Sequence, residues 1–110
     1  YIFSNDLLVP STIDALLPER PVLQQNFPNP FNPQTTITFS LPAPAPVRLS
    51  VYSVAGKRVA TLLDEIREPG SHEVVWNGQN DRGRSLPSGS YFYRLETDGE
   101  FVTRGMVLLK

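Results

Sequence analysis

The stretch Tyr91-Phe92-Tyr93-Arg94-Leu95-Glu96-Thr97-Asp98-Gly99-Glu100-Phe101-Val102 contains two strand-like runs separated by Asp98-Gly99. Tyr91, Tyr93 and Leu95 are spaced two residues apart, so they would share one apolar face of a strand. Asp98-Gly99 is typical of a two-residue hairpin, because both residues tolerate a positive φ. The stretch therefore predicts two antiparallel strands joined by a tight turn.

Similar runs occupy most of the chain after residue 22. Alternation and turn signals together predict strands at residues 23–27, 36–41, 47–54, 57–63, 72–76, 91–97 and 101–109. Ala55-Gly56 and Pro69-Gly70 provide turns between them. Residues 42–46 alternate Pro and Ala, which predicts a stiff connector between strands of different sheets. Short strands at about ten-residue intervals indicate an all-β antiparallel sandwich of about seven strands.

Length and composition indicate one small domain. The chain has 110 residues, a net charge of −1 and no Cys, so disulfides and thiolate metal sites are excluded. Scattered Lys and Arg do not favour a nucleic-acid partner, and the adjacent pair Lys57-Arg58 is interpreted as a solvated hairpin end. No apolar run approaches the roughly 20 residues that span a bilayer.

Residues 1–25 lack the regular apolar alternation found in the rest of the chain. Pro10, Pro18 and Pro21 interrupt short apolar patches, and Ser11 could cap a single helical turn before Pro18. We interpret residues 1–25 as an irregular N-terminal extension, a linker or the tail of an upstream domain. Residues 26–110 form the predicted folded domain.

The residues that could carry chemistry do not converge. His72 is the only histidine, and it lies in a predicted strand, where we expect it on the sheet surface. The carboxylates of Asp64-Glu65 and of Asp98 with Glu100 are predicted at turns, whereas an acid–base pair must face across a cleft. We therefore predict no catalytic residue, no bound metal and no cofactor.

Two segments allow a second interpretation. Residues 77–83 are rich in side-chain oxygens, which suits either a tight turn or a weak calcium site. Trp76 shares a face with Val74, which favours core packing over a sugar-stacking role. Phe92 points to the opposite face from Tyr91 and Tyr93, so it is the better candidate for an exposed aromatic.

Five motifs in order resemble a known family. They are Asn26-Phe27-Pro28-Asn29-Pro30-Phe31-Asn32-Pro33 before Thr35-Thr36-Ile37, then Val51 to Val59, His72 to Gly78, Ser88 to Leu95, and the ending Met106-Val107-Leu108-Leu109-Lys110. Residues 26–110 resemble the type A C-terminal sorting domain of the type IX (Por) secretion system. They are also similar to the FlgD-like immunoglobulin-like domain of the flagellar hook-capping protein, so an immunoglobulin-like fold is expected.

The resemblance to sorting domains implies a function. Such domains lie at the C-terminus of cargo proteins. The type IX translocon recognises the domain in the periplasm, and the cargo then crosses the outer membrane. A sortase-like peptidase can remove the domain, and the cargo is released or attached to surface lipopolysaccharide. The resemblance thus implies a secreted or cell-surface location and an upstream cargo domain as partner.

The resemblance also assigns the sorting-motif residues. They are Pro28, Asn29, Pro30, Gly89, Tyr91, Met106, Val107, Leu108, Leu109 and Lys110. We expect Gly89 to allow a close backbone approach, and the last strand to present a free edge for strand addition. Members often carry Lys before the Met-Val pair, where this chain has Gly105. The alternative functions are an assembly module of the hook-cap kind and a carbohydrate-binding module of a secreted hydrolase.

Overall fold

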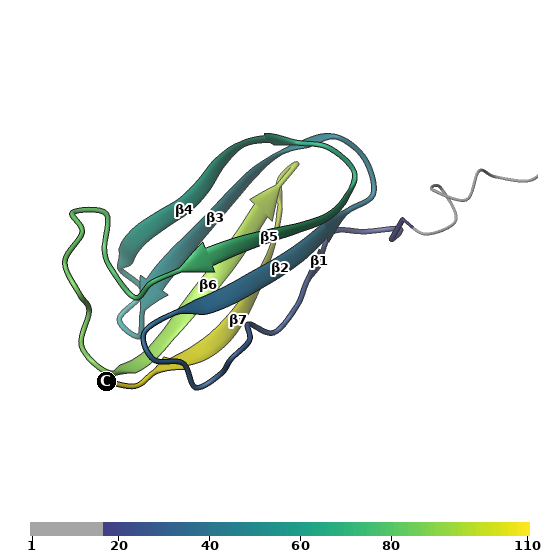
Figure 1. Cartoon of the computed structure of the whole chain (residues 1–110). Helices are drawn as coiled ribbons and strands as arrows, with labels where there is room; N and C mark the ends of the chain where they lie inside the picture. The colour runs from purple at the N-terminus through teal and green to yellow at the C-terminus, as the bar shows by residue number, and fades with distance from the viewer. Residues whose placement is uncertain (1–16) are drawn as a thin grey trace, which may run out of the picture.

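The computed structural model describes residues 17–110, which fold into seven β-strands without any helix (Figure 1). The strands are β1 (Val22–Leu23), β2 (Thr35–Leu41), β3 (Ala45–Ser53), β4 (Arg58–Arg67), β5 (Gly70–Trp76), β6 (Gly89–Thr97) and β7 (Glu100–Leu108). Among these residues, none belongs to a helix that could cross a bilayer. The predicted helical turn at Ser11 and most of the N-terminal extension lie outside the described residues.

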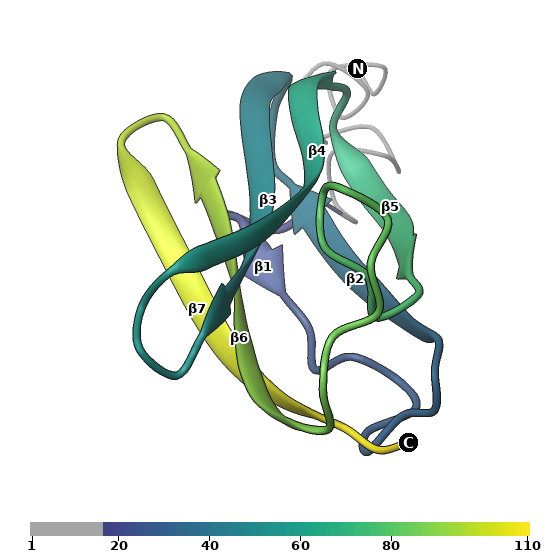
Figure 2. The ribbon, with the colours of Figure 1, turned by 90° about the vertical axis from the view of Figure 1, so that its left-hand side faces the viewer.

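The strands form two antiparallel sheets that face each other (Figure 2). One sheet has three strands in the order β1-β2-β5, and the other has four in the order β4-β3-β6-β7. The chain passes between the sheets after β2, after β4 and after β5. This arrangement confirms the predicted all-β sandwich.

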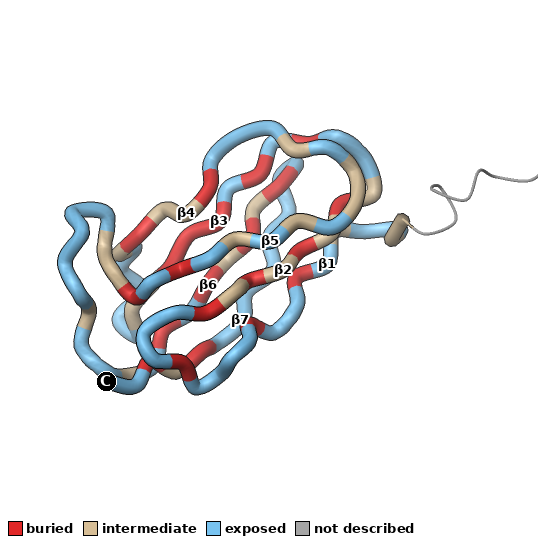
Figure 3. The backbone as a smooth tube through the Cα atoms, viewed as in Figure 1, coloured by how far each residue is buried: buried red, intermediate tan, exposed pale blue. Residues whose placement is uncertain are grey.

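The core lies between the two sheets and follows the period-2 pattern of the sequence. Buried and more exposed residues alternate along β2 and β6, as the burial colours show in Figure 3. Ile37 and Phe39 of β2 are fully buried, and Tyr93 of β6 is fully buried opposite them. Trp76 is 2% exposed, which confirms core packing. Phe92, on the outer face of β6, is 40% exposed as predicted.

The hairpins confirm the predicted turn chemistry. Asp98 and Gly99 have φ angles of 49° and 80° between β6 and β7, which pair along their whole length. Gly56 has a φ of 83° in the turn between β3 and β4. Only glycine and a few short polar residues adopt this region readily, which is why these residues occupy the turns. The β6–β7 register then runs unbroken from its turn, whereas the β3–β4 register shifts between Val51 and Tyr52 and again between Leu49 and Ser50.

β4 is longer than predicted, and this corrects the placement of two carboxylates. Asp64 and Glu65 lie within β4 and not at a turn. The strand continues because it keeps pairing with β3, where Arg48 faces Asp64 at 3.7 Å between Nε and Oδ2. Both side chains are solvated, so the apolar alternation that signals a strand is missing here.

Two other boundaries differ from the sequence pattern. The connector at residues 42–46 does join the two sheets, but β3 already begins at Ala45, whose side chain is buried. β1 ends at Leu23, earlier than predicted. Beyond it the Gln24 N–H donates to the Thr38 carbonyl, and Phe27 forms an isolated bridge to Thr36 before Pro28 removes a donor. Since Leu23 is buried and pairs with Phe39, strand pairing begins before residue 26.

Candidate functional site

Two sequence motifs from opposite ends of the domain lie side by side. Phe31 forms a parallel bridge with Leu108 at the end of β7. The Phe31 N–H donates to the Val107 carbonyl at 3.0 Å, and the Leu109 N–H donates to the Phe31 carbonyl at 2.9 Å. We call residues 28–31 together with Met106–Leu109 the terminal seam. The chain end marked C in Figure 1 lies beside it.

Asn29 completes the seam with its side chain. The Val107 N–H donates to Asn29 Oδ1 at 3.0 Å. Pro28 and Pro30 have no N–H, so the backbone on either side of Asn29 has no donor with which to continue a strand ladder. A side-chain carbonyl therefore takes the place of a backbone acceptor at this position.

Phe31 anchors the seam in the core, which the sequence motif alone did not show. Its side chain is 1% exposed, and its ring centroid lies 5.6 Å from that of Trp76. Trp76 in turn meets Tyr91 edge-on at 6.1 Å. The Trp76 indole N–H donates to the Gln79 carbonyl at 2.9 Å. The three rings join both sheets and the seam into one packed unit.

A buried polar network holds the Pro28 carbonyl at the start of the seam, and the sequence pattern did not reveal it. The Tyr93 hydroxyl donates to the Gln24 carbonyl at 2.6 Å and accepts the Asn26 N–H at 2.8 Å. Asn26 Nδ2 donates to Thr35 Oγ1 at 3.0 Å, and that hydroxyl donates to the Pro28 carbonyl at 2.8 Å. These contacts satisfy polar groups that would otherwise be buried without a partner.

Burial changes the acidity of two tyrosines near this network. Desolvation raises the pKa of Tyr93, while the Asn26 N–H and the charge of Arg104 act in the opposite direction. Desolvation also raises the pKa of Tyr91, whose hydroxyl donates to the Pro87 carbonyl at 2.8 Å. Both hydroxyls therefore serve as neutral hydrogen-bonding groups.

The other predicted motif residues also gather here, with one correction. Gly89 pairs with Leu108, and Tyr91 pairs with Met106. A Cβ at Gly89 would meet nothing within 4 Å, so the expected close backbone approach is wrong. Glycine suits this position instead because its φ is +154°, a backbone conformation that residues with a side chain rarely adopt. Met106 and Leu108 point into the core, whereas Leu109 is 49% exposed and Lys110 is exposed.

The edge of β7 is only partly free, which corrects the expected open strand. β7 is an edge strand of the four-stranded sheet. The seam occupies its backbone at Val107, and Gln25 Nε2 donates to the Gly105 carbonyl at 2.7 Å. Successive residues of β7 direct their backbone N–H and C=O groups alternately toward β6 and away from it. The outward groups of Phe101 and Thr103 have no hydrogen bond among residues 17–110.

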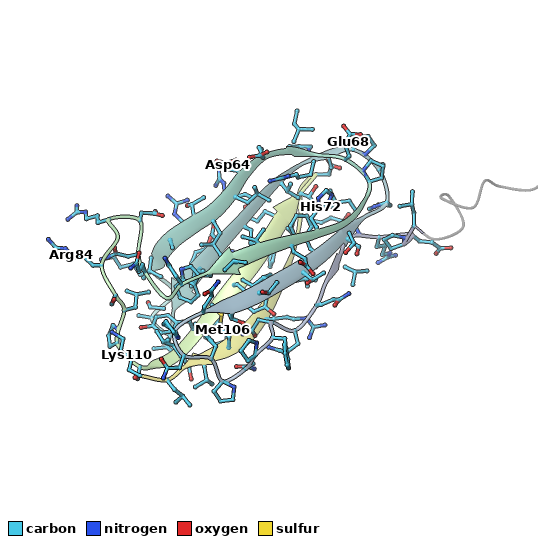
Figure 4. All side chains as sticks on the ribbon, in the orientation of Figure 1. Asp64, Glu68, His72, Arg84, Met106 and Lys110 are labelled. Atoms are coloured by element: carbon cyan, nitrogen blue, oxygen red, sulfur yellow. The ribbon has the colours of Figure 1, made fainter. Side chains whose placement is uncertain are left out.

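The described residues hold no convergent catalytic or metal-binding group. No cluster of three or more His, Cys, Asp or Glu occurs among residues 17–110. His72 was expected on the surface, but it is half-buried on the inner face of β5, because its ring stacks on Phe39 at 5.2 Å. Its Nε2 lies 2.7 Å from the Glu68 carbonyl (Figure 4 labels both).

The oxygen-rich loop at residues 77–83 uses its oxygens to close turns. Asn80 Oδ1 accepts the N–H groups of Arg82 and Arg84, at 2.9 and 3.0 Å. Asp81 Oδ1 accepts the Thr61 N–H at 2.9 Å, which ties the loop to the edge of β4. This geometry favours the turn interpretation over a calcium site, since Asn80 Oδ1 and Asp81 Oδ1 already accept backbone N–H groups.

Comparison with solved structures shows the same fold in three bacterial proteins. Dimeric latent PorU from Porphyromonas gingivalis aligns with a TM-score of 0.65 and 19% identity, over 84% of this chain and 10% of PorU. PorZ from the same organism aligns with a TM-score of 0.53 and 20% identity, over 78% of this chain and 11% of PorZ. FlgD from P. aeruginosa aligns with a TM-score of 0.54 and 20% identity, over 80% of this chain and 70% of FlgD.

This chain thus spans about a tenth of the length of PorU and PorZ. None of the curated protein sequences matches it. The model of the FlgD Ig-like domain matches residues 28–100, which is more than half of the chain and contains strands β2 to β6. The chain therefore belongs to the FlgD Ig-like domain family.

Proposed function

We propose that this chain is a non-catalytic sorting domain that directs an upstream cargo protein across the bacterial outer membrane through the type IX secretion system. Its partners would be the translocon and a sortase-like peptidase. The cargo would pass through the periplasm and then be released or attached to surface lipopolysaccharide.

The terminal seam is the observation that carries this proposal. The Pro28–Pro30 motif and the Met106–Lys110 ending contact each other through Asn29 and Phe31. Residues that the family resemblance marks at both ends of the domain therefore lie side by side, and Pro28, Asn29 and Pro30 are exposed there. Leu109 and Lys110 are exposed as well, so a translocon could read both segments at once.

The partly covered edge of β7 suggests how recognition would work. Strand addition needs free backbone groups, and these remain at Phe101 and Thr103. The seam blocks the same edge at Val107. A translocon would therefore contact the exposed tail and the seam itself, unless it displaced residues 29–31 from β7.

The fold similarity to PorZ and PorU supports the proposed sorting function. PorZ is an essential bacterial surface component of the type IX secretion system, and a domain of the same fold makes up a small part of it. PorU carries a domain of this fold as well. In both cases the matching region is a minor part of a longer chain, as an appended sorting domain would be.

An assembly module of the hook-cap kind is the second candidate. The matching region covers 70% of the P. aeruginosa FlgD chain, so the fold also suits a protein built mainly around such a domain. Either role relies on surfaces and not on catalysis. Export of a fused reporter separates the two, because an assembly module would not carry cargo to the cell surface.

A carbohydrate-binding role has less support. Trp76 is buried, so its ring is not available for stacking on a sugar. On the outer face of the four-stranded sheet, the Arg94 guanidinium lies 5.0 Å from the Tyr52 ring centroid and 4.5 Å from that of Phe101. The Arg side chain therefore covers part of the aromatic surface that a sugar would need.

The test is an export assay with the full 110-residue chain. The chain is fused to the C-terminus of a periplasmic reporter, in a bacterium that has the type IX system, and surface reporter is measured. Leu109→Ser/Lys110→Ser is compared with Ile66→Ser/Arg20→Ser, which changes an exposed apolar and an exposed basic residue far from the seam. Thermal unfolding checks that both variants fold.

We expect the unmodified fusion and the Ile66→Ser/Arg20→Ser control to reach the surface, and the Leu109→Ser/Lys110→Ser variant to remain in the periplasm. Retention of the unmodified fusion in the periplasm would overturn the sorting function. Equal export of both variants would preserve that function but remove the tail as its recognition surface.

A further inference from the structure

Four basic side chains surround one cavity at the end of the sandwich that carries the seam. The cavity measures about 400 Å³ and is lined by Lys57, Arg58, Val59, Asn80, Asp81, Arg82 and Arg84. Two of the basic residues follow the turn between β3 and β4, and two come from the loop after β5. We call this site the basic pocket. The sequence interpretation of Lys57-Arg58 as a solvated hairpin end missed it, because its partners are distant in the chain.

The positive charge of the basic pocket is not neutralised within the structure. Four of the ten Lys and Arg residues of the chain line it. The ion pairs found among residues 17–110 join Arg48 to Asp64 and Arg67 to Glu65, so none involves the pocket. Its only acid is Asp81, and one oxygen of that carboxylate already accepts the Thr61 N–H.

Charge is also unevenly distributed along the molecule. A separate hollow around the β6–β7 hairpin, at the opposite end of β3, is lined by Asp64, Glu96, Asp98 and Glu100 and by one basic residue, Arg48. Figure 4 shows Glu68 and Arg84 at opposite ends of the sandwich, with Lys110 at the same end as Arg84. The four cations of the basic pocket thus lie at the end of the sandwich away from these carboxylates, which raises the local attraction for an anion.

The loop that carries Arg82 and Arg84 is held in place from inside. Asn80 Oδ1 accepts both of their backbone N–H groups, and the Asn80 N–H donates to the Arg84 carbonyl at 2.9 Å. The Asp81 N–H also donates to the Val59 carbonyl at 3.3 Å. The backbone of Arg82 and Arg84 is therefore fixed in a closed turn, which reduces the backbone ordering that a ligand would require.

We infer that the basic pocket binds a phosphate group carried by a larger ligand. Guanidinium groups form paired hydrogen bonds with phosphate oxygens, and three Arg with one Lys supply donors from several directions. A cavity of about 400 Å³ is large enough for one phosphorylated group. The phosphate could belong to a soluble phosphorylated sugar or to a lipid headgroup. This inference does not depend on the proposed export function.

The experiment measures binding to the 110-residue chain in low salt by heteronuclear NMR titration. The soluble probes are inorganic phosphate and glucose 6-phosphate, and the lipid probe is a phosphatidylcholine vesicle with or without phosphatidic acid. Arg82→Gln/Arg84→Gln removes two pocket charges. Arg20→Gln/Arg48→Gln is the matched control, because it changes the net charge equally and lies outside the pocket.

We expect glucose 6-phosphate to shift the amide signals of Arg58, Asn80 and Arg84, with affinity that falls as salt rises. Arg82→Gln/Arg84→Gln should weaken binding by about tenfold or more, while the control stays within about twofold. Binding of soluble sugar phosphate alone supports a saccharide ligand, and binding of phosphatidic acid vesicles alone supports a lipid ligand. The inference is overturned if no probe binds, or if both variants lose equal affinity.

Discussion

Val107 and Asn29 are 78 residues apart in the chain, yet the Val107 N–H donates to the Asn29 side-chain oxygen at 3.0 Å. Their contact closes the end of β7 that would otherwise expose a donor. The same edge is joined by the backbone of Phe31. A short segment between prolines thus behaves as a partial eighth strand, without the alternation that marks a strand in sequence.

Asn29→Ala tests the side-chain part of this contact. The change removes the acceptor of the Val107 N–H, and the unfolding free energy should fall by about 0.5–1.5 kcal/mol in urea denaturation. Asn32→Ala is the control, because Asn32 is exposed and its side chain makes no hydrogen bond among residues 17–110. An equal loss in both variants would show that the Asn29 contact adds nothing to stability.

The packing of Phe31 on Trp76 predicts large and coupled losses of stability. Phe31→Ala and Trp76→Ala should each lower the unfolding free energy by about 3–5 kcal/mol, since each empties a fully packed site. Phe27→Ala should change it by less than about 0.5 kcal/mol, because Phe27 is 80% exposed. The double variant Phe31→Ala/Trp76→Ala should lose less than the sum of the single losses, since the rings share a contact. A loss under about 1 kcal/mol for Trp76→Ala would contradict its place in the core.

Much of the sandwich could be predicted because its signals are local. Strand alternation at Tyr91, Tyr93 and Leu95 reports which face is buried, and Asp98-Gly99 reports the turn. These features depend only on neighbours in sequence. The prediction failed along β4 after Leu63, where paired charges on an edge strand hide the alternation.

The seam and the basic pocket could not be derived from local pattern. Phe31 is a core residue only because Trp76 and Leu108 lie beside it after folding. The family motif marked the positions around Phe31 without showing what they contact. Lys57 and Arg84 likewise become neighbours only when the loop after β5 closes against β4.

The buried tyrosines predict a loss of stability in alkali. Burial raises the pKa of Tyr93 in the folded chain, so the unfolded chain releases this proton first. Stability should be fully present below about pH 10 and should fall as pH rises through the folded pKa, with a slope of up to about 1.4 kcal/mol per pH unit for one proton. Urea denaturation between pH 8 and 11 measures this slope. Tyr93→Phe should reduce it, although the variant is less stable at neutral pH because the Asn26 N–H loses its acceptor. An unchanged slope would show that Tyr93 does not titrate differently on unfolding.

Comparing Gly78→Ala with Gly83→Ala distinguishes the cost of backbone strain from the cost of steric crowding at the seam. Both have nearly the same positive φ, 75° and 77°. Ala at either position should therefore lower the unfolding free energy by about 1–2 kcal/mol through backbone strain alone. A Cβ at Gly83 would meet nothing within 4 Å. A Cβ at Gly78 would lie 3.2 Å from the Pro33 carbonyl oxygen and 3.5 Å from Leu108 Cδ1, at the buried end of β7.

Gly78→Ala should therefore lower the unfolding free energy by about 1–3 kcal/mol more than Gly83→Ala does. Thermal or urea unfolding of the two variants measures the difference. Equal losses would mean that the backbone around Pro33 yields freely, and that close packing between this loop and the chain end does not stabilise the seam.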